Sequence, residues 1–235
     1  MMKYSFIYII CLLFAFSGCT SPRLEREVKD RPIGRAFVPG NVYTVGDMPI
    51  DIKKVLYLPL THRAGVELGD GVSDALITAL RRSGRFELVV LDHEALARML
   101  PNATGFSVGS TVPSSLLQAA GEEYGVDAIM QVEVTQYRPY KPISLGFRGR
   151  LFTAEEAKVL WSIDEVFDAG QESVAIGARL YSERFVEQAF PLQSSYSSLF
   201  SPRRFVSYVG QVTFETLPKL ILCGFNSVGL FAESK

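Results

Sequence analysis

Cys19 is the side chain with the clearest chemical role in this sequence. It follows a start with one basic residue, Lys3, an apolar stretch over Tyr4–Phe16, and the small pair Ser17–Gly18. A basic start, a short apolar stretch and then small residues are the order typical of a secretory signal peptide. The apolar stretch is 13 residues long, shorter than the roughly 20 residues that a membrane-spanning helix needs. We therefore expect residues 1–18 to be a signal peptide.

The residues before Cys19 resemble the lipobox of bacterial lipoproteins, with Phe16 where leucine is usual. The resemblance implies cleavage before Cys19 and lipidation of the new N-terminal cysteine, whose acyl chains would hold the protein on a lipid bilayer. Thr20, in place of an aspartate, implies export to the outer membrane, facing the periplasm. The alternative is an ordinary signal peptide with a chance cysteine at its end.

Two further groups of side chains are candidates for catalysis. His62 follows Thr61 in a loop, and three carboxylates are grouped as Asp164, Glu165 and Asp168. A histidine beside a hydroxyl, or paired carboxylates, can do acid–base work. However, the sequence has no GxSxG elbow, GxGxxG loop or GKS/GKT run. We expect no catalytic residue, no metal and no cofactor, and keep an envelope enzyme using Thr61–His62 or the carboxylates as an alternative.

Aromatic and aliphatic side chains in two polar segments are candidates for partner binding. Tyr137 and Tyr140 lie in or beside the link Pro139–Pro142, and others lie in the serine-rich segment Pro191–Pro202. Aromatic anchors often supply most of the binding energy of protein interfaces. The candidate partner-binding residues are Tyr137, Tyr140, Leu192, Tyr196, Leu199 and Phe200. The alternative is that these side chains pack back onto the neighbouring sheet edge and helices.

Overall charge and composition exclude some classes of protein. Lys plus Arg number 24 and Asp plus Glu 25, which gives a formal net charge of -1. A near-neutral chain has no long-range field to attract nucleic acid. A hydrophobic fraction of 48% is ample for a packed core. We expect a folded protein that does not bind nucleic acid.

Pattern along the chain divides it into four parts. After the signal peptide, residues 19–50 are rich in Pro and Gly and are expected to form a tether or an irregular arm. Residues 51–222 alternate strand and helix patterns, and residues 223–235 are expected to be a C-terminal tail. Short apolar runs at Val55–Leu60 and Phe86–Leu91 predict buried strands.

Helical and alternating patterns complete the expected fold. Apolar steps of three and four predict helices over Gly65–Ser83, His93–Leu100 and Ser114–Tyr124. Strict alternation then predicts three antiparallel strands, around Ala128–Thr135, Leu145–Phe152 and Val159–Asp164, before two closing helices. We expect an α/β domain with a mixed parallel and antiparallel sheet of about five strands, flanked by helices. Trp161 stands among apolar neighbours and is expected in the core.

Several of these segments together resemble the CsgG/LpoB/TolB-N superfamily of bacterial envelope proteins. The resemblance is carried by the strand Val55–Leu60, the segment Leu80–Phe86, the run Gly125–Val126–Asp127 before a strand, and the hairpin ending Val159–Ser162. It covers about residues 52–168. It implies a TolB-N/CsgG-like α/β domain that works through protein contact.

These observations combine into a functional hypothesis. We expect a lipid-anchored, non-enzymatic envelope protein whose α/β domain binds an envelope protein partner or a further copy of itself. The roles suggested are assembly, secretion or envelope synthesis. The main alternative is a subunit of a CsgG-like oligomeric secretion pore, although Gln136–Arg150 and Gly170–Phe200 do not clearly supply the membrane-crossing hairpins that such a pore requires.

Overall fold

The structure of this chain is a computed structural model that describes residues 33–99, 108–186 and 195–220. All described helices and strands belong to one compact unit, Arg35–Lys235. The expected signal peptide, Cys19 and the expected tail 223–235 lie outside the described residues. None of the helices in the described part of the chain has the length and apolarity needed to cross a membrane.

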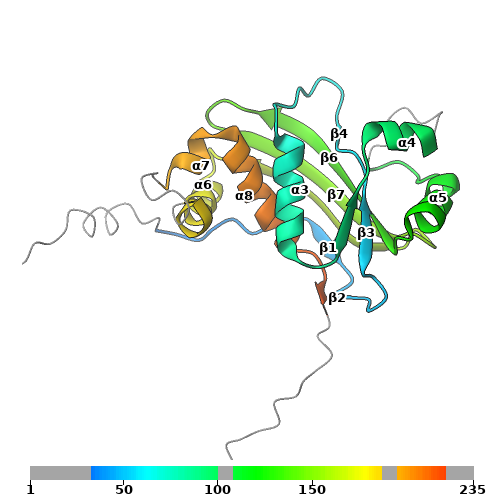
Figure 1. The fold of residues 1–235 in the computed structure, drawn as a ribbon. Helices are drawn as coiled ribbons and strands as arrows, with labels where there is room; N and C mark the ends of the chain where they lie inside the picture. Colours follow the sequence, from blue (N-terminus) through cyan, green and yellow to red (C-terminus); the bar gives the residue numbers. More distant parts are fainter. Residues whose placement is uncertain (1–32, 100–107, 187–194, 221–235) are drawn as a thin grey trace, which may run out of the picture. The chain divides into compact units, whose positions relative to one another are not determined.

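A mixed sheet forms the centre of the unit (Figure 1). Its seven strands are β1 (Val42–Thr44), β3 (Lys54–Tyr57), β4 (Thr61–His62), β5 (Glu87–Val90), β6 (Ala128–Arg138), β7 (Ser144–Thr153) and β8 (Val159–Asp168). The order is β1-β8-β7-β6-β3-β5, and β4 also pairs with β6. Strand β3 is parallel to β5 and β6, whereas β6, β7 and β8 are antiparallel. The expected α/β fold with a mixed sheet is therefore confirmed.

Helices cover the two faces of the sheet unequally. They are α3 (Val72–Ser83), α4 (His93–Met99), α5 (Ser114–Tyr124), α6 (Glu172–Tyr181), α7 (Ser197–Phe200) and α8 (Pro202–Glu215), and a π-helical turn, η1 (Ser182–Val186), continues α6. Helices α3, α6 and α8 contribute to the larger core, together with the inner residues of β6, β7 and β8. Helices α4 and α5 pack over β3 and the start of β6, where a second, smaller core forms.

Two short elements enlarge the sheet beyond the expected five strands. Strand β1 pairs antiparallel with β8, and β4 pairs parallel with β6. Both are only two or three residues long and show no alternation of their own. They exist because long neighbouring strands offer unpaired backbone groups.

Residues 37–48, within the segment expected to be a tether or arm, lie against the domain. The ring of Phe37 contacts that of Phe167 edge-on at 5.2 Å, and Met48 is fully buried. Met48 belongs to the short strand β2 (Asp47–Met48), which pairs parallel with β9 (Lys219–Leu220). Val38 and Tyr43, by contrast, are exposed.

Helix α3 starts later than its apolar pattern predicts. The expected helix began at Gly65, but the helix begins at Val72, after Gly71 at φ +79°. Glycine tolerates this left-handed conformation, which breaks a helix. The helix ends as expected at Gly84, also left-handed at φ +62°, whose N–H donates to the Arg81 carbonyl.

Trp161 on β8 is completely buried, as its sequence context predicts. Its indole Nε1–H donates to the Thr216 hydroxyl at 2.9 Å, and its ring centroid lies 6.4 Å from that of Phe214. Gly149, on the neighbouring strand β7, makes room for the ring, since a Cβ there would lie 2.9 Å from two indole carbons. Trp161 therefore ties the sheet to the end of α8.

Candidate functional site

The two segments predicted to bind partners meet at one end of the sheet. The turn between β6 and β7 carries Tyr140 and Lys141, and the Lys141 ammonium lies 3.1 Å from the centre of the Phe200 ring in α7. Tyr196 lies one helical turn before Phe200. We call Tyr140, Lys141, Tyr196 and Phe200 the aromatic patch. Sequence reasoning named its three aromatic residues but had no signal for their juxtaposition.

The aromatic side chains of this patch are exposed to different degrees. Tyr140 is 79% exposed, Phe200 54% and Tyr196 38%. Arg179 of α6 lies over the Tyr196 ring, 4.0 Å from its centre. A cation placed over an aromatic ring in this way is attracted by the ring quadrupole and favours the ring orientation that keeps this contact. The patch is therefore partly ordered before any partner arrives.

The remaining predicted partner-binding residues lie elsewhere. Leu199 packs against the larger core between the exposed positions of α7, and Ser198 is fully buried. Tyr137 is half-buried on β6 and also packs against this core, and burial raises the pKa of its phenol. Leu192 lies outside the described residues. Part of the Pro191–Pro202 segment thus packs inward, as short helix α7, while Tyr196 and Phe200 stay accessible.

The three grouped carboxylates on β8 each have a separate structural partner. Asp164 receives two hydrogen bonds from Arg148, at 2.9 and 2.6 Å. Glu165 accepts the backbone N–H groups of residues 40 and 41, and Asp168 forms an ion pair with Arg138 at 3.1 Å. Among the described residues, no three His, Cys, Asp or Glu side chains are placed to hold a metal ion.

The Thr61–His62 pair lies at the edge of the sheet as strand β4. The Thr61 hydroxyl donates to the Val132 carbonyl at 3.1 Å, so it supports the pairing of β4 with β6. The exposed His62 ring has Nδ1 3.4 Å from the carbonyl oxygen of Arg63. The Thr61 hydroxyl therefore has a structural role, whereas the His62 ring lies exposed at the sheet edge.

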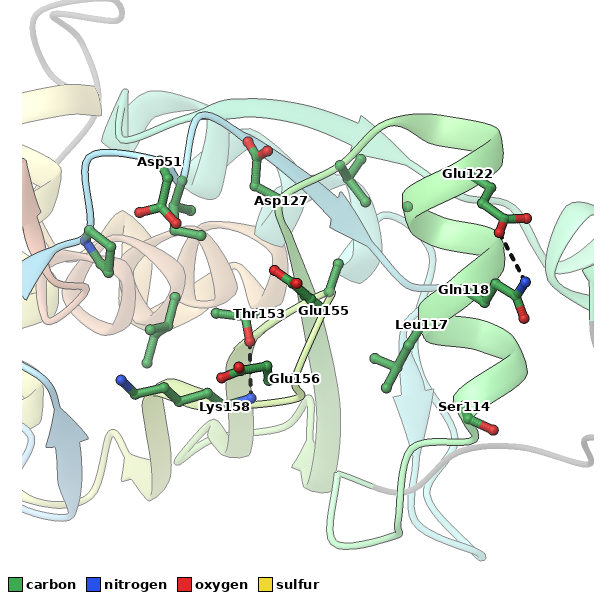
Figure 2. Close-up of a pocket in the computed structure, with 16 residues that line it drawn as sticks. Asp51, Ser114, Leu117, Gln118, Glu122, Asp127, Thr153, Glu155, Glu156 and Lys158 are labelled. Atoms are coloured by element: carbon green, nitrogen blue, oxygen red, sulfur yellow. Dashed lines mark hydrogen bonds between the residues drawn. The ribbon is translucent and has the colours of Figure 1, made fainter.

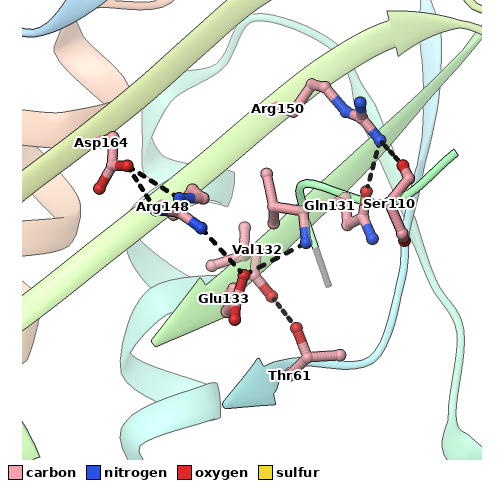
Figure 3. Close-up of polar contacts among 9 residues, drawn as sticks. Thr61, Ser110, Gln131, Val132, Glu133, Arg148, Arg150 and Asp164 are labelled. Atoms are coloured by element: carbon pink, nitrogen blue, oxygen red, sulfur yellow. Dashed lines mark hydrogen bonds and ion pairs between the residues drawn. The ribbon is translucent and has the colours of Figure 1, made fainter. Parts of the chain in front are cut away.

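Polar side chains form two rows across β6 and β7, on the face opposite the larger core, and the first row extends to β8 (Figure 3). The first row joins Glu133, Arg148 and Asp164 through registered strand positions. Arg148 contacts Asp164 closely and Glu133 at 3.9 Å. Glu133, which is nearly buried, also accepts the N–H of Val108 at 3.2 Å. This row therefore holds the chain around residue 108 on the sheet.

The second row is centred on Arg150. Its guanidinium donates to the side-chain oxygen of Gln131 at 3.0 Å and to the Ser110 carbonyl at 3.1 Å (Figure 3). Burial lowers the pKa of this guanidinium. Sequence reasoning missed both rows, although alternation along β7 places Arg148 and Arg150 on one face.

A shallow groove of about 830 Å³ lies far along the sheet from the aromatic patch, between α5, the β7–β8 turn and residues 49–52 (Figures 1 and 2). Its charged lining residues are Asp51, Glu122, Asp127, Glu155, Glu156 and Lys158. Several already serve the fold. The Asp127 carboxylate accepts two backbone N–H groups, and Glu122 accepts from Gln118 at 2.9 Å. The groove therefore has an acidic lining whose side chains are partly engaged.

Comparison with known proteins gives similarities of structure alone. No protein-family model matches this sequence, and no curated protein sequence does. A PelC dodecamer from Paraburkholderia phytofirmans is similar at 12% identity over 73% of this chain and 94% of that one, with a TM-score of 0.41. The lipoprotein GNA1162 from Neisseria meningitidis is similar at 15% identity over 60% and 99%, with a TM-score of 0.35.

A third similar structure is that of LpoB, which is also one of the proteins that name the superfamily that the sequence resembles. The LpoB C-terminal domain from Salmonella enterica is 16% identical over 52% of this chain and 86% of that one, with a TM-score of 0.38. At these identities and TM-scores, the similarity is confined to the general arrangement of strands and helices.

Proposed function

We propose that this chain is a lipid-anchored protein of the bacterial cell envelope that acts by binding a protein partner through the aromatic patch. The observation that carries the proposal is the contact between Lys141 and Phe200. It brings the segment that carries Tyr140 beside α7, and the rings of Tyr140, Tyr196 and Phe200 are all exposed. The signal-like start and Cys19 support an envelope location at the outer membrane, facing the periplasm. The protein acts by contact and not by catalysis.

An aromatic patch of this kind suits protein recognition for physical reasons. Tyr and Phe bury a large area on binding, and their rigid rings lose little conformational freedom. Here the freedom of Phe200 and Tyr196 is already reduced by Lys141 and Arg179 over their rings. Affinity is gained when such ordering precedes binding.

Replacing the two most exposed rings of the patch should remove partner binding and leave the fold intact. For Tyr140→Ser with Phe200→Ser, we expect partner recovery from cells, after cross-linking and purification of the full chain, to fall by about tenfold or more. The free energy of unfolding should change by less than about 1 kcal/mol, because both rings are largely exposed.

Tyr43→Ser is the matched control for that experiment. Tyr43 is also 54% exposed but lies on β1, outside the patch. It should leave partner recovery unchanged. Equal recovery by the double variant and by wild type would remove the patch from the functional account, as would a binding defect that merely follows a lowered melting temperature.

The proposed anchor predicts a specific role for one thiol. Cys19→Ala should abolish lipidation, so the lipid mass should be absent and the protein should appear in the soluble envelope fraction. Stable membrane attachment of this kind requires more than one acyl chain. Mass spectrometry and fractionation measure both effects. Cys223→Ala, which removes the other thiol of the expected mature chain, should change neither, and unlipidated wild-type protein in the soluble fraction would refute the anchor.

A further inference from the structure

The segments that form the aromatic patch carry positive charge only. Residues 139–142 and 195–200 contain Lys141 and no Asp or Glu. Arg179 adds a second cation at the Tyr196 ring, where it also donates to the Ser195 hydroxyl at 3.4 Å. Asp168, on β8, is already paired with Arg138. Lys141 and Arg179 therefore place positive charge at the rings of Phe200 and Tyr196, although the whole chain is near neutral.

The Lys141 ammonium is placed to meet an anion from outside. An ammonium has three N–H donors, and the Phe200 ring lies on one side of it. An aromatic ring provides no negatively charged oxygen, and Lys141 takes part in none of the ion pairs among the described residues. A partner that covers the aromatic rings also removes water from this cation. A desolvated cation is costly unless a carboxylate or similar group pairs with it.

Resting on the proposed function, we infer that the partner presents an acidic protein segment, with carboxylates flanking an apolar or aromatic anchor. The anchor would pack against the exposed rings of Tyr140 and Phe200, and a carboxylate would pair with Lys141. Opposite charges on two surfaces speed their encounter and select against other partners.

The geometry favours a protein segment over an anionic bilayer. Helices that lie in a membrane surface present an apolar face over several turns. Helix α7 spans only Ser197–Phe200, and its Leu199 packs against the core of this domain. The rings of Phe200 and Tyr196 are each partly covered by a cation, 3.1 and 4.0 Å from the ring centre. Such a short, partly covered surface fits an extended peptide better than lipid.

Peptide binding by the full chain in nonionic detergent tests this inference. The probe is a fluorescent peptide with one tryptophan between two runs of three glutamates, and its matched form has glutamine in place of every glutamate. We expect the glutamate peptide to bind at least about tenfold more tightly. Its affinity should weaken as NaCl rises from about 0.05 to 0.5 M, because exposed charges are screened by salt.

Reversing the charge of Lys141 tests whether this lysine pairs with the glutamates of the peptide. Lys141→Glu should weaken binding of the glutamate peptide by about tenfold or more and should not weaken binding of the glutamine peptide. Lys53→Glu is the matched control, since it makes the same charge change at another exposed lysine of the domain. It should leave both affinities unchanged.

Three results would overturn the inference. If both peptides bind equally and Lys141→Glu has no effect, while Tyr140→Ser with Phe200→Ser still abolishes partner recovery, the acidic partner is wrong and the proposed function stands. If the Cys19→Ala chain floats with phosphatidylglycerol vesicles in a Lys141-dependent manner and ignores the peptides, the patch contacts lipid. If sedimentation shows self-association that Lys141→Glu abolishes, without peptide binding, the occupant is a second copy.

Discussion

Trp161→Ala is expected to lower the free energy of unfolding by about 3–5 kcal/mol. The indole is completely buried and packs beside Gly149 and Phe214. Its removal leaves a cavity between β8 and α8, and the Thr216 hydroxyl loses the indole N–H. Because a domain of ordinary stability has only about 5–15 kcal/mol in total, this change should remove a large share of the stability of the fold. Urea denaturation followed by far-UV circular dichroism, which does not depend on tryptophan fluorescence, measures this loss of stability.

Two further variants make the Trp161 result specific. Trp161→Phe keeps most of the ring volume but loses the bond to Thr216, so it should cost clearly less than the alanine change. Tyr43→Ala removes an exposed aromatic ring from neighbouring strand β1 and should change stability by less than about 0.5 kcal/mol. A loss below about 1 kcal/mol for Trp161→Ala would contradict the packing described and reopen a surface role for the indole.

Strong local patterns explain which parts of this fold the sequence predicts well. The alternation along β6, β7 and β8 identifies the strands and the residues that face the larger core, although residues 128–134 of β6 are buried on both faces and not on one as the pattern predicts. The stops of α3 and α5 at Gly84 and Gly125 are equally local, since both residues have positive φ. The same reasoning applied to β8 explains the acidic group. Neighbouring strand residues point to opposite faces, so Asp164 and Glu165 cannot form one site.

The parts that sequence reasoning missed depend on contacts between distant segments. Strand β1 is fixed by its pairing with β8, and Glu165 accepts the backbone N–H groups of residues 40 and 41 just before it. Helix α7 has a serine-rich sequence typical of a loop, yet the Ser198 hydroxyl is buried against that of Ser182. The contact between Lys141 and Phe200 likewise exists only once the β6–β7 turn and α7 are placed together.

Asp127 offers the sharpest test of what the Gly125–Val126–Asp127 run does. Its carboxylate Oδ2 accepts the backbone N–H groups of Lys53 and Lys54 at 2.9 and 2.8 Å, which joins the start of β3 to the start of β6. Its own carbonyl accepts the N–H of Ala154, after β7. One residue thus connects three neighbouring strands at one end of the sheet, beside the acidic groove (Figure 2).

Asp127→Ala should therefore lower the free energy of unfolding by about 2–3 kcal/mol, because hydrogen bonds to a charged group are lost and the part-buried N–H of Lys54 is left without its acceptor. Asp127→Asn retains one side-chain oxygen and should cost about 1 kcal/mol.

Asp51→Ala is the matched control, since it removes the same charge from an exposed carboxylate of the same groove. It should change the free energy of unfolding by less than about 0.5 kcal/mol. Amide hydrogen exchange at residues 53 and 54 should accelerate only in the Asp127 variants. Equal stability losses for Asp127→Ala and Asp51→Ala would mean that the carboxylate does not fasten β3 to β6. Asp127→Asn should also leave partner recovery unchanged. Gly125 ends a helix, Val126 is buried and Asp127 pairs two strands, so we expect this run to stabilise the fold and not to bind a partner.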